Sequence, residues 1–146
     1  MELSKQVCSK EQGEKLELLG ITAPSIFCHV YPHMNSGWKV LQHGMFDPYD
    51  EGLELFPAFT LSELGVMLPE YLKEFQLIQW GIPNKQGANI SYGCQYRIEP
   101  RQATTQVIPE SVLFGDTETI VRAAMLIYLL ENNLITASDC NTRLNA

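Results

Sequence analysis

The chain has 146 residues, which fits one domain, and its composition of 45% apolar, 10% aromatic and 18% charged residues is typical of a globular protein. Acidic residues outnumber Lys and Arg by 17 to 10, so the formal net charge is −7. This charge argues against a nucleic acid polymer as partner, because phosphate contacts require a cationic surface. The longest apolar run, Ala123 to Leu130, is far shorter than the roughly 20 residues that cross a bilayer, so we expect no membrane span.

Four cysteines, Cys8, Cys28, Cys94 and Cys140, lie far apart in the sequence. None belongs to a pair with the two-residue gap that is typical of zinc and redox motifs. The first residues, Met1 to Lys5, also lack the apolar stretch of a secretory signal. We therefore expect reduced thiols in a cytoplasmic protein.

Two helices are indicated by the same start signal, a Ser or Thr followed three residues later by Gln or Glu. In this capping box the two residues satisfy each other's backbone amides. Ser9 predicts a helix over about residues 10–19, and Thr60 predicts one over about 61–68. Pro69 limits the second helix, because proline cannot continue the hydrogen-bond pattern.

Strands are predicted where β-branched and aromatic residues gather between turn-forming residues. Residues 25–31 and 37–42 are expected to form one hairpin, and residues 75–82 and 90–99 supply two further strands. The last of these alternates between apolar and polar residues throughout. Such alternation indicates one buried face and one face that meets something polar.

The remaining segments are predicted as two loops and a final helix. Residues 43–58 contain prolines, glycines and acids and are interpreted as a solvated connection, and residues 100–109 as a loop. Asp116 or Thr117 is expected to cap a helix that runs through Glu131. This helix is apolar on nearly all sides, so it should be buried as the centre of the core.

The element order is helix, strand, strand, helix, strand, strand, helix. Hairpins between helices cannot form parallel crossovers throughout, so the sequence predicts an α+β fold with an antiparallel sheet and helices packed on one face. The single domain should cover residues 1–136. The polar residues 137–146 are expected to fray.

Alternation also sorts the strand residues between two sheet faces. We expect Ile78, Trp80 and Cys94 to point at the helices and Leu77 and Gln79 to lie on the opposite face. That opposite face mixes aromatic rings with hydrogen-bond donors, which suits binding. The predicted ligand-binding residues on it are His29, Tyr31, Lys39, Gln95 and Arg97.

In this predicted site the aromatic rings would stack on a planar ligand, and Lys39 and Arg97 would meet an anionic group. Two other interpretations stay open. The face can be an ordinary open sheet face with scattered apolar residues, or it can be covered by residues 43–58 or by another subunit. A register slip of one residue would invert the assignment of any strand.

Other chemistry has weaker support in the sequence. Cys28, His29, His33 and His43 are zinc-ligand types, but Cys28 and His29 point to opposite faces of a strand, so a core thiol and surface histidines are favoured. The acidic run Asp47 to Glu54 lacks the spacing of a calcium loop. No nucleophile elbow, protease signature or phosphate-binding glycine pattern occurs. We expect no cofactor, no metal and no enzymatic activity.

Three segments, Leu3–Ser9, Pro57–Pro69 and Ala123–Asn132, carry a resemblance that extends over most of the chain. With them the chain resembles a group of small uncharacterised proteins encoded by phages, prophages and mobile elements of gut bacteria. These segments determine the fold, and no activity or site residue follows from them. The resemblance implies a phage accessory protein in the cytoplasm of a bacterial host cell.

Small accessory proteins of this kind often act by binding. The leading hypothesis is therefore a non-enzymatic binding module that sequesters a small anionic, nucleotide-like signalling ligand or inhibits host defence. The alternative is a protein that binds a host protein or forms a homo-oligomer without any small ligand. A third hypothesis is a nucleotide hydrolase, which would need convergent acids or a metal.

Overall fold

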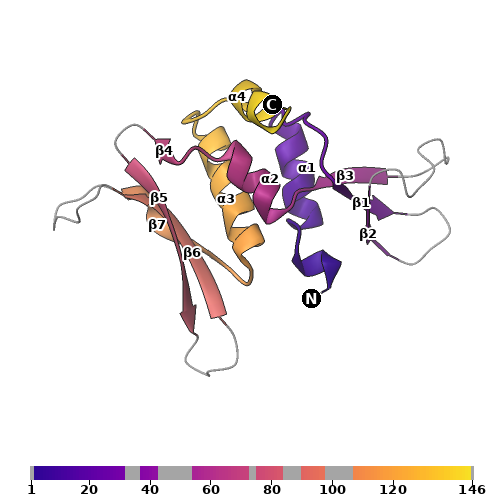
Figure 1. Cartoon of the computed structure of the whole chain (residues 1–146), viewed down its shortest axis with the longest axis horizontal. Helices are drawn as coiled ribbons and strands as arrows, with labels where there is room; N and C mark the ends of the chain where they lie inside the picture. Colours follow the sequence, from indigo (N-terminus) through magenta and orange to yellow (C-terminus); the bar gives the residue numbers. More distant parts are fainter. Residues whose placement is uncertain are drawn as a thin grey trace.

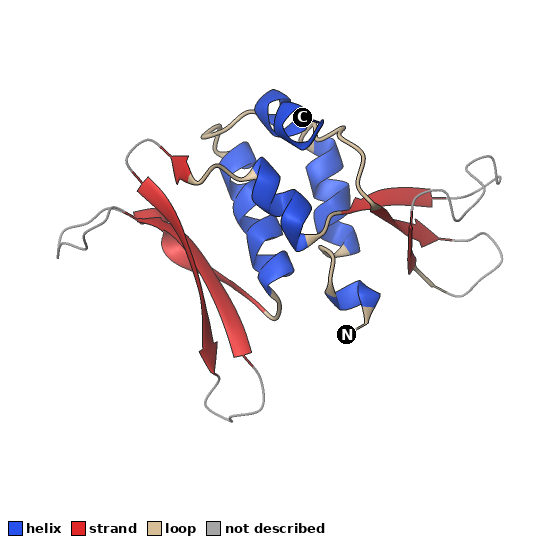
Figure 2. Cartoon of the chain, in the orientation of Figure 1, coloured by secondary structure: helices blue, strands red, loops and turns tan. Residues whose placement is uncertain are grey.

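The computed structural model describes residues 2–31, 37–42, 54–72, 75–83, 90–97 and 107–145. Four α-helices occupy the centre of the described part, and two antiparallel sheets lie on opposite sides of them (Figures 1 and 2). The α+β class is confirmed. The predicted single sheet is instead divided into two, so the helices are packed between sheets rather than on one face of a sheet.

The helical centre is built from segments at both ends and the middle of the chain. No helix in the described ranges is long and apolar enough to cross a membrane. The helices are η1 (Leu3–Lys5, a 3-10 turn), α1 (Lys10–Leu18), α2 (Leu61–Met67), α3 (Glu118–Glu131) and α4 (Ala137–Asn145).

Both predicted capping boxes are present. The Ser9 hydroxyl accepts from the Gln12 amide while the Gln12 side chain accepts from the Ser9 amide, and Thr60 and Glu63 repeat the arrangement at α2. Glu63 has a second role. Its Oε2 accepts a 3.0 Å hydrogen bond from the Ile26 amide, so one buried carboxylate ties the start of α2 to the chain entering the first sheet.

Helix α3 is the buried core helix that its sequence predicts. Thr117 caps it, and Asn133 takes the left-handed conformation just after it, with φ of 56°. Five of its apolar side chains have no exposed surface, and they pack with residues from every helix and from the larger sheet. These five are Val121, Ala123, Met125, Leu126 and Leu129.

The first sheet has three strands in the order β2-β1-β3, with both pairings antiparallel. Strands β1 (Phe27–Tyr31) and β2 (Lys39–Gln42) confirm the predicted hairpin. The third strand, β3 (Glu54–Ala58), contradicts the prediction that residues 54–58 belong to a solvated connection; the rest of that connection, residues 43–53, lies outside the described residues.

The second sheet has four strands in the order β4-β5-β6-β7, again antiparallel. Strands β5 (Phe75–Pro83) and β6 (Ile90–Arg97) confirm the predicted pair, and β4 (Tyr71–Leu72) adds a short edge. Strand β7 (Val107–Gly115) contradicts the end of the predicted loop. Residues 100–106 of that loop lie outside the described residues.

The last turns of the chain are helical rather than frayed. In α4 the Thr136 hydroxyl accepts from the Asp139 amide, and Cys140 is buried with its thiol 3.7 Å from the Met67 carbonyl oxygen. Few apolar side chains therefore anchor this helix to the core. Because its sequence is mostly polar, the hydrophobic pattern did not predict a helix there.

The predicted sheet faces are correct for β6 and inverted for β5. Cys94 is buried against the helices as expected. In β5, however, Leu77 packs on the core, and Gln79 accepts a 2.6 Å hydrogen bond from Nε of Arg122 in α3. Ile78 and Trp80 therefore lie on the side away from the helices, which is the one-residue inversion that strand geometry allows.

Candidate functional site

The structure does not bring the five predicted binding residues together. His29, Tyr31 and Lys39 belong to the three-stranded sheet, whereas Gln95 and Arg97 belong to the four-stranded sheet on the other side of the helices (Figure 1). The predicted common site is therefore wrong. The assumption that failed was that all strands share one sheet.

His29 and Tyr31 have structural environments in the first sheet. His29 is buried rather than on the surface, and its Nε2 lies 2.7 Å from the Cys8 carbonyl oxygen. Tyr31 packs on Trp38 with ring centroids 5.3 Å apart, and the Lys10 ammonium lies 4.8 Å from the Trp38 ring. Lys39 is exposed on the other side of this sheet.

The cysteines lack the character of nucleophiles. None of the four forms a disulfide, and all four are buried. Burial raises the pKa of Cys8 and of Cys94 to about 12, and it raises the pKa of Cys28 and Cys140 as well. A thiol must ionise to attack, so these groups are inert near neutral pH. Among the residues that the structure describes, no three His, Cys, Asp or Glu side chains gather as metal ligands.

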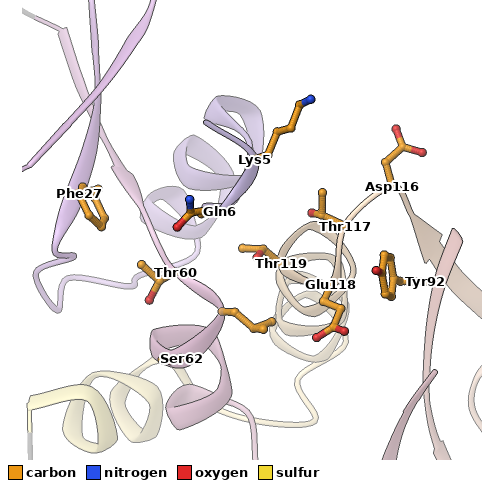
Figure 3. A pocket seen from close by; sticks show the side chains of 11 residues that line it. Lys5, Gln6, Phe27, Thr60, Ser62, Tyr92, Asp116, Thr117, Glu118 and Thr119 are labelled. Atoms are coloured by element: carbon orange, nitrogen blue, oxygen red, sulfur yellow. The ribbon is translucent and has the colours of Figure 1, made fainter. Parts of the chain in front are cut away.

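The strongest candidate site is a cavity of about 460 Å³ at the point where α2 and α3 begin, here called the helix-start cavity (Figure 3). Its volume lies in the range of small-molecule sites. Apolar surface comes from Leu61 and from two rings on opposite walls, Phe27 of the first sheet and Tyr92 of the second. Residues from both sheets and from the helices between them therefore line the cavity.

The polar lining of the cavity combines hydroxyls with a few charges. The charged residues of the lining are Lys5, Asp116 and Glu118 (Figure 3). One cation and two carboxylates give the lining no excess of positive charge. The hydroxyl and amide side chains are those of Gln6, Thr60, Ser62, Thr117 and Thr119.

Helix capping explains why this cavity has free donors. Thr60 and Thr117 are the N-caps, and their hydroxyls accept from the third amide of each helix. The amides before it have no partner within a helix. Those amides belong to Leu61 and Ser62 in α2 and to Glu118 and Thr119 in α3, and all four residues line the cavity.

Thr119 contributes a hydroxyl to the lining of this cavity. The residue is only 5% exposed, yet its hydroxyl makes no hydrogen bond with any described residue. Among the described residues no fully buried side-chain nitrogen or oxygen lacks a partner, so this hydroxyl is accessible rather than enclosed. Because Thr119 lines the cavity, a ligand placed there can satisfy it.

Sequence reasoning identified both caps but not the cavity. The cap at Thr60 is confirmed, and of the two predicted caps for the last long helix, Asp116 and Thr117, the structure shows Thr117. The two helix starts are more than fifty residues apart, so only the tertiary fold brings them together. No sequence signal marked Thr119, which looked like an ordinary position in the first turn of α3.

Comparison with known proteins adds no relative. No protein-family model, curated protein or solved structure matches the chain. The resemblance to phage-encoded proteins therefore stays a prediction.

Proposed function

We propose that the protein is a non-enzymatic binding module that holds a small molecule in the helix-start cavity. The observation that carries the proposal is a cavity of about 460 Å³ that is lined by Thr119, whose hydroxyl makes no hydrogen bond with any described residue. Aromatic walls, free helix amides and hydroxyls are the mixture that small-ligand sites use for affinity and orientation.

The charges of the lining refine the class of ligand. The first-turn amides of α3 and Lys5 favour an oxygen acceptor, but Asp116 and Glu118 oppose a high negative charge. A neutral or zwitterionic polar ligand with an apolar or planar body fits better than a nucleotide with several phosphates. From the resemblance, the setting is the cytoplasm of a bacterial host cell, where the protein acts as a phage or mobile-element accessory protein.

Native mass spectrometry of protein incubated with a library of polar metabolites tests the proposal. The expected result is a retained molecule of low mass. Ser62→Trp should abolish retention, because Ser62 is exposed at the second position of α2 and the indole would fill the cavity mouth. Ser138→Trp is the matched control at the second, exposed position of α4 and should retain the molecule.

A smaller change tests the hydroxyl itself. Thr119→Val keeps the shape of the side chain and should weaken binding of the retained molecule by about 2- to 12-fold, as expected for one hydrogen bond. Equal affinity of the two proteins would contradict the role of Thr119. Conversion of the bound molecule to a product would contradict the non-enzymatic assignment.

A further inference from the structure

We propose that the four-stranded sheet carries a second binding surface, on which Arg97 receives an Asp or Glu side chain of a partner protein. The surface, here called the outer face, consists of Tyr71, Ile78, Trp80, Arg97 and Phe114, and the buried Gln95 side chain in the same set of outward positions supports Arg97. This inference concerns a different side of the sheet from the helix-start cavity and does not depend on it.

Strand register defines the outer face. Gln79, Cys94 and Leu113 are paired in one row, and Gln79 and Cys94 face α3. The neighbouring row pairs Trp80 with Gly93 and Gly93 with Phe114, so it points the other way. Among the described residues, no helix or strand lies on that side (Figures 1 and 2).

Arg97 is held in place before any partner arrives. The Gln95 side chain is buried, and its Nε2 donates to the Pro109 carbonyl oxygen at 3.0 Å. Its Oε1 then accepts from Nε of Arg97 at 2.9 Å. The guanidinium lies 4.5 Å from the Trp80 ring centroid, so both its edge and its plane are fixed.

Gly93 makes this arrangement possible. A Cβ at Gly93 would lie 2.9 Å from two carbons of the Trp80 indole, so only glycine lets the ring lie against the strand. The indole in turn supports Arg97. The sequence thus provides three aids for orienting one cation: a buried amide, a ring and a glycine.

The fixed guanidinium has most of its hydrogen-bonding capacity left. Arginine has five N–H donors, and Arg97 uses the one on Nε to bond Gln95. The two terminal nitrogens of Arg97 make no hydrogen bond or ion pair with any described residue. Arg97 is also the sole charged side chain among the described residues of the outer face. A planar fork of donors that meets no counter-ion among the described side chains matches a carboxylate bound through both oxygens.

The surroundings of Arg97 indicate a protein as the source of the carboxylate. Tyr71 is 56% exposed and Phe114 57% exposed, and both are large apolar side chains on this face. Trp, Tyr and Arg are the residues that dominate binding energy in protein interfaces. A sheet surface with this composition suits a partner segment that presents an acidic residue among apolar ones.

The test selects displayed random peptides on the wild-type protein after removing those that bind Arg97→Gln. Enriched peptides should contain Asp or Glu next to apolar residues. Their affinity should fall about tenfold or more in Arg97→Gln, and Arg97→Lys should not restore it because an ammonium lacks the planar fork. Lys39→Gln, which removes an exposed cation from the other sheet, is the matched control and should leave affinity unchanged.

A change in the peptide tests the same contact on the unaltered protein, so misfolding of the Arg97→Gln variant cannot explain the result. Replacing the enriched Glu by Gln should lower affinity for the wild-type protein to the same extent as Arg97→Gln does. Enrichment without acids, or stronger binding when phosphoserine replaces the Glu, would overturn the proposal. Ser62→Trp should leave peptide binding intact, so failure here and failure of the cavity proposal can be told apart.

Discussion

His29 shows how burial sets the behaviour of a single titratable group. Its Nε2 must donate to the Cys8 carbonyl oxygen, because a carbonyl can only accept. Burial lowers the pKa of His29 below its ordinary value near 6.5, and the nearby Lys10 also lowers it, although the hydrogen bond to Cys8 and the charge of Glu11 act in the opposite direction. Folding therefore favours the neutral ring.

This preference predicts a loss of stability in mild acid. Above about pH 6.5 His29 is neutral in both states and contributes no pH dependence. As the pH falls below this value, the unfolded chain binds the proton first, so the free energy of unfolding should decrease by up to about 1.4 kcal/mol per pH unit until the folded pKa is reached. Urea unfolding at pH 7.5, 6.5 and 5.5 measures this decrease.

The control for the pH effect is His29→Gln. Glutamine can donate to the Cys8 carbonyl oxygen but does not titrate, so the decrease between pH 6.5 and 5.5 should become smaller. The same decrease in both proteins would show that other groups cause it.

At the scale of elements, α1 packs on β3 through a glycine. A Cβ added to Gly13 would overlap the backbone oxygen of Pro57. Glycine inside a helix costs about 1 kcal/mol relative to alanine. The sequence keeps it here because the helix and the strand approach each other through their backbones.

Gly13→Ala should therefore destabilise the protein in spite of its better helix propensity. We expect a loss of about 1–3 kcal/mol or more, since the clash is with backbone and α1 must move away from β3. Thermal and urea unfolding measure the loss. Glu17→Ala introduces the same residue at an exposed position of α1 and should be nearly neutral; a stabilised Gly13→Ala would contradict the close packing.

The strands that sequence patterns missed are all edge strands. Of β3, β4 and β7, the two longer ones contain proline: Pro57 in β3 and Pro109 in β7. Proline is tolerated at sheet edges because no ladder hydrogen bond is required on the open side. Proline is also the usual sign of a loop, so local patterns assigned these segments wrongly.

Helices were easier to predict than faces and sites. The capping boxes at Ser9 and Thr60 are local, and their signals were sufficient. The face of β5 depends on a period of two, so one residue of error inverted it. Gln95 and Arg97 did prove to be partners, because they lie two residues apart on one strand, whereas His29 and Lys39 could be joined to them only by assuming the sheet order.

At the scale of the whole molecule, no described strand of one sheet pairs with a strand of the other, and the helices lie between the two sheets (Figure 2). This arrangement raises the question of whether the layers unfold together. The core cluster joins all four helices to the four-stranded sheet, and the buried Glu63 carboxylate and the Gly13 contact tie the three-stranded sheet to α2 and α1. We therefore expect one cooperative unit.

The four cysteines report on this cooperativity, because they are distributed over the layers. Cys28 lies in the three-stranded sheet, Cys94 in the four-stranded sheet, and Cys8 and Cys140 at the helical centre. At pH 8 without denaturant, iodoacetamide should label none of them appreciably, since burial blocks access and raises each pKa. Mass spectrometry after labelling at increasing urea should give one midpoint for all four. An earlier midpoint for Cys28 than for Cys94 would show that the smaller sheet opens separately, and the single-domain description would then fail.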